Sequence, residues 1–541
     1  MDFNHFNPEE CIWYQEFYFQ SNKSPEKAVV TAILLLLLLF IVVQLAVKKF
    51  IFGKEKSRLS KKYIGAKINQ WDKLPRFPLL KLIWLCRDQK SVLETGRRLA
   101  GENGPFLRVT VLGEEYLLLN NPDLAEKILS SRDFGHIIKP PQLYEPLFDL
   151  IGHGLLTSNG EAWHSKRKIM TKAFTYPALK RYTKIYNKCA KRTVAQLTQK
   201  FRKDDKEYHQ INAIIQTGGI EIISETVLGL DVTQHKEDAK IMFTSVNRWK
   251  EITFQRFGTG WLVVPLFWRW SSLAREYYRR LGDIDNVIKR MIKRCRDELT
   301  DQPELKLGGN NANDSFDNMM QLMIKSDFSE LIILDEVKTM IMAGYETVSA
   351  TIHVFLFMLA LHQTHQASCR EEVDRIFDDP ANCANEELTM EALSEMKYLE
   401  RCLLESMRMF PIVFITARKL EAPLNIDDNL EIPIGTTVVV PNILLHKSPI
   451  HFPQPDEFQP DRFLPENCAK RHAYTYLPFS AGPRGCLGIK FSLLEAKTIV
   501  AHILRNFEIY TNDKIDDVPM IPSILLRPQR DFYFRLEKRN I

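Results

Sequence analysis

Two long runs of apolar residues interrupt the alternation of hydrophobic and polar positions along this chain of 541 residues. The first run occupies residues 28–47, and Gln44 is its most polar member. A helix of that length reaches about 30 Å, which is the thickness of a hydrocarbon core. We therefore predict a single membrane-spanning helix at residues 28–47.

Charges on the two sides of this run indicate its orientation. Acidic residues outnumber lysines in segment 1–27, whereas lysine and arginine dominate segment 48–73. By the positive-inside rule, segment 1–27 is lumenal and segment 48–73 is a cytosolic basic linker. A cleaved signal peptide is the alternative, but its apolar stretch would be shorter. We expect an uncleaved anchor, followed by one large domain over residues 74–541.

The second run, residues 333–361, is mostly apolar and is compatible with a helix throughout. Such a uniformly apolar helix is buried at the centre of a large domain. Its middle, residues 343–347, reads AGYET, which introduces a small pair, an acid and a hydroxyl. The Thr347 hydroxyl can donate to the carbonyl of Ala343, four residues earlier, and loosen the helix there.

Strand patterns elsewhere are short. Segments with strand character are 107–112, 116–119, 431–445, and a last hairpin of 524–526 with 532–535. Most of 122–307 follows helical periodicity, and the Gly- and Asn-rich stretch 301–316 indicates a surface loop. We predict a mainly α fold with small β-sheets.

Composition excludes several classes of protein. The net charge of +6 is mild and does not indicate a nucleic-acid partner. Nine cysteines occur without a C-x-x-C pair, which is typical of a reduced cytosolic domain. No phosphate loop or dinucleotide motif is present, so electrons for any redox chemistry must come from another protein.

One cysteine lies in a glycine-rich loop that leads into a helical stretch, with the pattern Phe479-x-x-Gly482-x-Arg484-x-Cys486-x-Gly488. Unpaired N–H groups at a helix start stabilise a thiolate and lower its pKa, and glycines admit a large flat group. A thiolate, an aromatic shield and a cation for a carboxylate together describe axial ligation of haem iron. The alternative is a buried cysteine beside a tight turn.

The loop resembles the haem-binding signature of the cytochrome P450 superfamily. The resemblance implies that the domain has the cytochrome P450 fold and binds haem b. It further implies that Cys486 is the metal ligand and that Phe479, Arg484 and Gly488 belong to the cofactor site.

The central motif, residues 343–347, resembles the superfamily's oxygen-activation motif, which implies that Glu346 and Thr347 handle protons. Residues 154–168 resemble the clan of fatty-acid ω-hydroxylases and its insect members. Where that clan often carries a glutamate esterified to haem, this chain has Ala343. We therefore expect non-covalent haem apart from the cysteine–iron bond, and a substrate that is not restricted to fatty acids.

Three further residues resemble a structural triad of the family. Glu405 and Arg408 lie at i and i+3 of a predicted helix and can pair, which alone is a common surface arrangement. With Arg462 they resemble the buried ion-pair triad behind the haem, which holds the cysteine loop in place.

Two residues upstream, Trp163 and Arg167, resemble the family's Trp-x-x-x-Arg helix, whose named residues meet a haem propionate. Arg418 is a third cofactor-binding residue by its position downstream of Pro411. The guanidinium fork suits carboxylates because it can bond both oxygens. By itself, Arg167 also fits a solvated basic run.

The sequence indicates two surfaces that would contact partners. The tryptophan-rich segment 256–270 fits either a membrane interface with lipophilic substrates or core packing. A basic surface that would attract an acidic flavoprotein is formed by Lys166, Lys470, Arg471 and Lys490.

We therefore expect a haem-thiolate monooxygenase of the endoplasmic reticulum membrane that oxidises a fatty acid, a hormone-like lipid or a xenobiotic. NADPH–cytochrome P450 reductase is the expected electron donor, with cytochrome b5 as a second donor. Two alternatives remain open at this point: a haem-thiolate isomerase or dehydratase that needs no reductant, and a non-catalytic haem- or ligand-binding protein.

Overall fold

The computed structural model describes most of the chain from residue 106 to residue 540. The gaps are 112, 133–136, 203–205, 232–233, 259–261, 263–264, 302–317, 427–429 and 523; residues 76–77, 94, 96 and 98 are also described. The predicted anchor at 28–47, its flanks and most of the predicted loop at 301–316 lie outside the described residues.

Helices dominate, as the sequence predicts. They are α5 (Pro122–Leu129), α6 (Pro141–Ile151), α7 (Gly160–Met170), α8 (Tyr176–Lys200), α9 (Asn212–Ile223), α10 (Lys236–Gly258), α11 (Pro265–Trp270), α12 (Ser272–Asp301), α13 (Met319–Lys325), α14 (Glu330–Leu361), α15 (Gln363–Phe377), α16 (Met390–Glu395), α17 (Lys397–Met409), α18 (Asn442–His446), α19 (Pro465–Ala469) and α20 (Ile489–Asn506).

The strands are short and form small sheets, which confirms the predicted fold class. They are β1 (Arg76–Phe77), β2 (Phe106–Val111), β3 (Glu114–Leu119), β4 (Ile137–Ile138), β5 (His209–Gln210), β6 (Cys383–Ala384), β7 (Glu387–Leu388), β8 (Thr416–Leu420), β9 (Leu424–Asn425), β10 (Glu431–Ile432), β11 (Thr437–Val440), β12 (Phe507–Thr511), β13 (Met520–Pro522), β14 (Leu526–Pro528) and β15 (Tyr533–Lys538).

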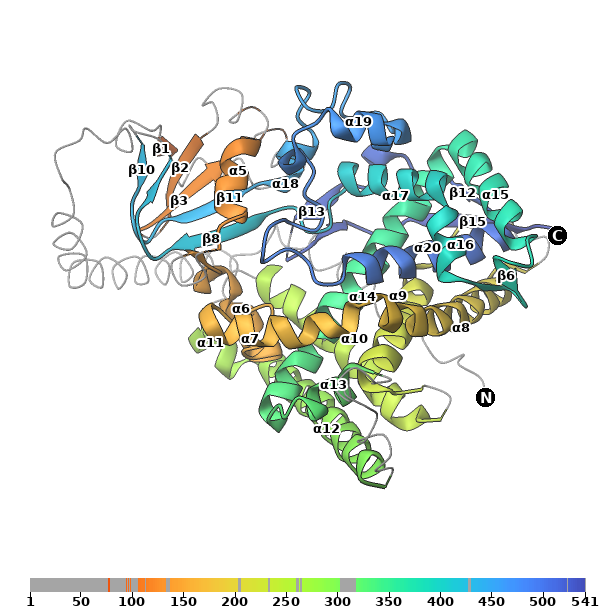
Figure 1. Ribbon diagram of the computed structural model, residues 1–541, viewed down its shortest axis with the longest axis horizontal. Helices are drawn as coiled ribbons and strands as arrows, with labels where there is room; N and C mark the ends of the chain where they lie inside the picture. The colour runs from red at the N-terminus through yellow and green to blue at the C-terminus, as the bar shows by residue number, and fades with distance from the viewer. Residues whose placement is uncertain are drawn as a thin grey trace, which may run out of the picture.

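Helix α14 is the long central helix that the second apolar run predicts. Ser329 caps it by accepting a hydrogen bond from the Ile332 N–H, and the helix ends at Leu361. It packs against α9, α12, α17 and α20, and Figure 1 shows it among these helices. The helix is long and apolar enough to cross a membrane, but 67% of its most apolar stretch is buried inside the protein. It is therefore the core helix of the domain.

The largest sheet lies beside the helices, with α5 over it (Figure 1). Its strand order is β1-β2-β3-β11-β8-β4, and β2 and β3 pair as the predicted antiparallel hairpin. Strand β8 pairs with β11 on one side and with β4 on the other. This pairing places β4, at one edge of the sheet, beside β8, which is far from it in the sequence.

Two strand predictions are wrong in part. The predicted hairpin of 524–526 with 532–535 does not form: β14 pairs with β13, whereas β15 pairs with β12 and β5. Segment 431–445 contains β10 and β11 but ends in the helix α18. Strand character was correct for most of both segments, but β14 pairs with the neighbouring β13, β15 pairs with distant strands, and α18 replaces the end of the second segment.

The tryptophan-rich segment 256–270 contains examples of both alternatives, core packing and an exposed surface. Trp268 is 3% exposed and packs on the Tyr277 ring, with centroids 5.3 Å apart, while the Arg256 guanidinium lies 4.4 Å from its ring. It is therefore a core residue. The exposed apolar side chains of α11 are Leu266, at 64%, and Trp270, at 82%. Trp261 lies outside the described residues.

An ion-pair cluster joins α17 to the chain that precedes the cysteine loop. Both Glu405 and Arg408 are completely buried, and Arg408 donates to the two carboxylate oxygens of Glu405 at 2.7 and 2.9 Å. Arg462 Nε lies 3.3 Å from Glu405 Oε1 as an ionic contact. The Arg408 guanidinium also donates to backbone carbonyls of His446, Pro455 and Glu457. The cluster thus fixes residues 446–462 against the helical core.

We predict that Glu405→Gln lowers the free energy of unfolding by about 3–5 kcal/mol, because two buried guanidinium groups lose their counter-charge. Urea denaturation followed by circular dichroism measures this loss. The matched control is Glu421→Gln, since Glu421 is exposed, and it should change stability by less than about 0.5 kcal/mol. Equal, small effects of the two substitutions would contradict the prediction.

Candidate functional site

The loop of Cys486 is held rigidly against the end of α5. Gly482 has φ +69°, and a Cβ at this position would lie 1.9 Å from the carbonyl oxygen of Leu129. The N–H of Cys486 donates to the carbonyl of Phe479 at 2.9 Å. Helix α20 begins directly after Gly488, as the sequence indicates. The sulfur is therefore presented from a backbone with little freedom.

The Cys486 thiol has a raised pKa, whereas the sequence led us to expect a lowered one. Burial raises this pKa and outweighs the Gly488 N–H, Arg167 and Lys139, each of which lowers it. The residue nonetheless keeps accessible surface. Protein therefore encloses the thiol on most sides, although the residue is not fully buried.

Helix α7 supplies two of the predicted residues beside this loop. Arg167 Nη1 donates to the carbonyl of Gly485 at 2.9 Å, one residue before the cysteine. The guanidinium of Arg484 lies 4.4 Å from the centroid of the buried Trp163 ring and donates to Ser158 O at 2.9 Å. The structure therefore brings Trp163, Arg167 and Arg484 together around Cys486.

Strand β8 adds Arg418 to the same cluster. This residue is 2% exposed, its Nη1 donates to Ala417 O at 2.8 Å, and its Nη2 is buried without a hydrogen-bond acceptor. Burial lowers the pKa of Arg418, and burial together with Arg418 lowers the pKa of Arg484 to about 9. A buried donor without an acceptor indicates that an anionic group belongs beside it.

A flat cofactor with carboxylates, such as haem, fits these residues. The cationic donors suit its carboxylates, the accessible thiol suits its iron, and the backbone at Gly488 leaves room. A Cβ at Gly488 would lie 4.0 Å from the Cys486 sulfur.

The middle of α14 has an accessible face within an otherwise buried helix. Ala343 is exposed and Thr347 is half-buried, and the Thr347 hydroxyl donates to Ala343 O at 2.7 Å, as expected. The helix continues through this turn. The hydroxyl therefore occupies a fixed place on an open face.

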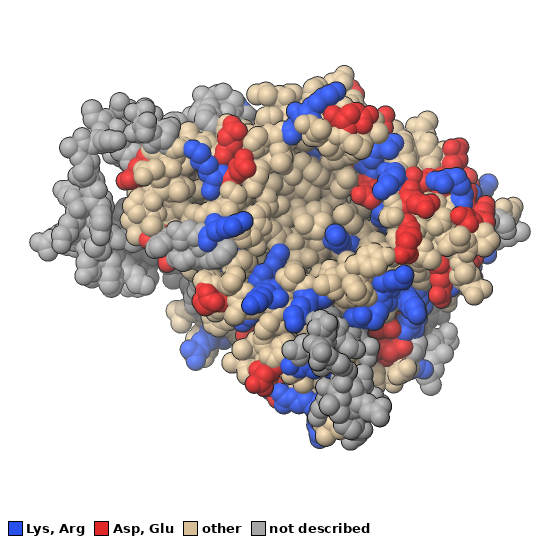
Figure 2. All heavy atoms as spheres, viewed as in Figure 1, with Lys and Arg blue, Asp and Glu red and all other residues tan. Residues whose placement is uncertain are grey.

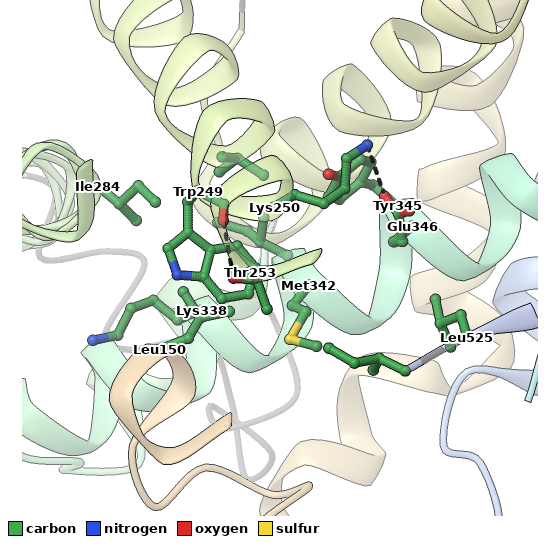
Figure 3. A pocket seen from close by; sticks show the side chains of 13 residues that line it. Leu150, Trp249, Lys250, Thr253, Ile284, Lys338, Met342, Tyr345, Glu346 and Leu525 are labelled. Atoms are coloured by element: carbon green, nitrogen blue, oxygen red, sulfur yellow. Dashed lines mark hydrogen bonds and ion pairs between the residues drawn. The ribbon is translucent and has the colours of Figure 1, made fainter. Parts of the chain in front are cut away.

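The Glu346 side chain extends from α14 towards Lys250 (Figure 3). Its Oε2 lies 3.3 Å from Lys250 Nζ of α10, in an ionic contact without hydrogen-bond alignment. Lys250 Nζ also donates to Gln216 Oε1 at 3.1 Å. Burial and the Glu346 carboxylate raise the pKa of Tyr345 well above its usual value. The carboxylate is thus enclosed between α14, α10 and α9.

A cavity of about 40 Å³ adjoins Glu346. Apart from two lysines and Glu346, its lining is mainly apolar, from α6, α10, α12, α14 and residues 524–525: Leu150, Val246, Trp249, Lys250, Thr253, Ile284, Lys338, Ile341, Met342, Tyr345, Glu346, Ile524 and Leu525. Lys338 is paired with Asp285 at 3.0 Å. The space beside the acid therefore favours apolar molecules.

The predicted basic surface is correct only in part. Lys166 does not belong to it, because its Nζ lies 3.4 Å from the buried Glu336 and its side chain is 12% exposed. Arg471 is partly buried and donates to Arg462 O. Lys470 and Lys490 are exposed. Figure 2 shows basic side chains gathered over the α7 and α8 region.

Sequence reasoning missed Lys139 and Lys250. Lys139 lies within electrostatic reach of Arg418, Arg484 and Cys486, and Lys250 holds Glu346. Neither belongs to a spacing motif, since each reaches the site through the packing of a distant element. No local signal could have identified them.

We predict that Gly482→Ala destabilises the protein by more than about 2 kcal/mol, because the new methyl group adds a clash with the Leu129 carbonyl to the strain at positive φ. Gly435→Ala is the matched control: its φ is +85° and nothing lies within 4 Å of the added Cβ. It should cost about 1–2 kcal/mol, from the backbone strain alone. Equal midpoints of urea denaturation for the two variants would rule out the clash.

Comparisons with known proteins agree with this geometry. The family model for cytochrome P450 matches residues 73–535. "Cytochrome P450 4c3" of Drosophila melanogaster is 31% identical over 442 residues, 78% of this chain and 80% of the relative. "Cytochrome P450 4V2" of Homo sapiens is 30% identical over 448 residues, 81% of this chain and 83% of the relative.

Among solved structures, the haem domain of cytochrome P450DA has the same fold. Its TM-score is 0.70 at 21% identity, with 86% of this chain and 97% of that chain covered. The cysteine loop and the central helix agree with this family, and the family model covers most of the chain. The chain belongs to the cytochrome P450 family of haem-thiolate monooxygenases.

Proposed function

We propose that this protein inserts one oxygen atom of dioxygen into a lipophilic substrate and reduces the other to water, with electrons from NADPH delivered by a reductase. One observation carries the proposal: Cys486, on a rigid loop, has accessible surface and lies amid buried cations. The open face of α14 and the apolar cavity provide the other parts that such a reaction needs.

In this proposal Cys486 would supply the thiolate ligand of haem b, and Arg167, Arg418 and Arg484 with Trp163 would hold its propionates. When bound, the haem iron supplies the binding and activation of dioxygen. Coordination also resolves the state of the thiol, because a metal holds its sulfur ligand as thiolate although burial raises the pKa of the free group. Phe479 fixes the cysteine backbone through its carbonyl.

Thr347 and Glu346 are the proposed proton-handling groups. Because the Thr347 Oγ1 proton is directed to Ala343 O, the oxygen's lone pairs can accept a hydrogen bond from water on the open face. Glu346 is the proposed proton relay: its carboxylate would take up a proton from solvent and pass it on, and Lys250 positions it. Movement of Lys250 would release the carboxylate towards Thr347.

The walls of the cavity beside Glu346 are mainly apolar, which favours an apolar part of a substrate, but a volume of about 40 Å³ does not hold a whole lipid. The proposed substrate class is a fatty acid, a hormone-like lipid or a xenobiotic such as an insecticide. Ala343 leaves the face of α14 open where the related clan often carries a glutamate. The Ala343 side chain is a single methyl group, which leaves room for bulkier substrates than a glutamate at this position would.

The buried cluster of Glu405, Arg408 and Arg462 is the proposed support of the cysteine loop. It binds the backbone of residues 446–462, which leads into that loop. The role is structural, since all three side chains bond to one another or to backbone carbonyls.

The proposed redox partners and membrane location rest on the exposed lysines and on the predicted anchor. The proposed electron donors are NADPH–cytochrome P450 reductase and cytochrome b5, which would meet exposed lysines of α7, α8 and α20: Lys168, Lys180, Lys184 and Lys490. Residues 28–47 would anchor the chain in the endoplasmic reticulum membrane with the domain in the cytosol. The exposed Leu266 and Trp270 of α11 would contact the bilayer.

Turnover with isotopic dioxygen tests the proposal. The full-length protein is reconstituted with reductase in vesicles and given a panel of fatty acids, terpenoid and steroid hormones, and insecticides. We expect an oxygenated product that carries one atom from ¹⁸O₂ and depends on NADPH. Product formed without NADPH would indicate an isomerase or dehydratase, and haem binding without any product would indicate a binding protein.

We predict that Thr347→Ala reduces product per NADPH consumed by about tenfold or more, because positioned proton transfer contributes at least that much. NADPH consumption and peroxide release are measured together with product. The control is Thr351→Ala, one turn further along α14, where the hydroxyl donates to Thr347 O at 2.8 Å. A Thr347→Ala variant that couples as well as the control would contradict the assigned role.

A further inference from the structure

Lys139 has a backbone that is fixed on two sides next to the cysteine loop. It directly follows β4, and one step beyond the paired residues the β4–β8 register sets it beside Arg418. Its N–H donates to Asn159 Oδ1 at 2.9 Å. Pro140 and Pro141 follow and restrict the chain further. The side chain is therefore presented in a defined direction.

The positive charges around the Lys139 ammonium group favour the binding of an anion there. Its Nζ donates to the Tyr144 hydroxyl at 3.0 Å and lies 4.8 Å from that ring. Burial, then Arg418 and Arg484, lower its pKa well below the usual value, and only Cys486 opposes them. Among the described residues, no carboxylate contributes to this balance. A buried ammonium group among cations is costly unless an anion joins them.

Lys139 also lies near the cysteine. Like Cys486, it retains accessible surface although protein encloses it closely enough for burial to dominate its pKa. Each of the two residues acts on the pKa of the other, which places them within electrostatic reach. A ligand bound at the sulfur therefore lies within range of the ammonium group if it is as large as haem.

We propose that Lys139, supported by Tyr144, is a cofactor-binding residue whose ammonium group binds a propionate carboxylate of the haem. This proposal rests on the proposed function, in that it requires haem at Cys486. It adds an anchor from the β4 edge to those from α7, β8 and the cysteine loop. A charge-assisted bond of this kind strengthens retention of the cofactor rather than its chemistry.

The test compares two cofactors in the full-length protein. Haem and haem dimethyl ester, whose propionates are uncharged methyl esters, are each loaded into the original protein, Lys139→Met and Lys139→Arg. The rate of cofactor loss to excess apomyoglobin is then measured by absorbance. Lys289→Met on α12 is the control, because Lys289 is exposed.

We expect Lys139→Met to lose haem roughly tenfold faster than the original protein, as removal of a hydrogen bond to a charged group implies. With the dimethyl ester this difference should vanish, and Lys139→Arg should retain haem nearly as well as the original protein. An equal effect on both cofactors, or no effect on either, would overturn the proposal. If the original protein binds no haem, the proposed function fails instead.

A second variant covers the case in which Lys139→Met does not fold. Tyr144→Phe removes only the hydroxyl that supports the ammonium group, and circular dichroism verifies its fold. It should lose haem several-fold faster, again with no difference for the dimethyl ester. The same loss with both cofactors would count against the proposal.

Discussion

Positive charge enclosed around a cysteine is the constraint on which the rest of this structure depends. Guanidinium groups from α7, β8 and the cysteine loop converge on Cys486, and at least one of their nitrogens is buried without an acceptor. Such a cluster is unfavourable unless anions complete it. The thiolate and the carboxylates of a haem are suitable anions, so the architecture is that of a site built for cofactor binding.

The surrounding fold can be understood as the support for this cluster. Gly482 allows the loop to lie against the end of α5 at a distance that a side chain would prevent. The buried Glu405–Arg408 pair fixes the preceding segment through backbone carbonyls. Helix α14 turns an accessible face around Ala343 and Thr347, whereas most of the helix is packed. Rigid support and a local opening are thus combined in one core.

The sequence was informative where chemistry and structure are encoded within a few residues. The cysteine loop, the limits of α14, the β2–β3 hairpin and the Thr347–Ala343 bond all depend on local spacing, and the structure shows each of them. Predictions failed where distant packing decides the outcome. Lys166 pairs with Glu336 instead of lying on the basic surface, and only packing decides that Trp268 takes the core position that the sequence left open. Lys139 belongs to no motif, because only the β4–β8 pairing places it at the site.

The carbon-monoxide difference spectrum of the reduced, full-length protein tests the central claim most directly. The proposal predicts the Soret band of a haem with thiolate coordination, and loss of that band in Cys486→Ser while circular dichroism shows an intact fold. A folded protein that binds haem without the thiolate band, or a Cys486→Ser variant that retains it, would contradict the account.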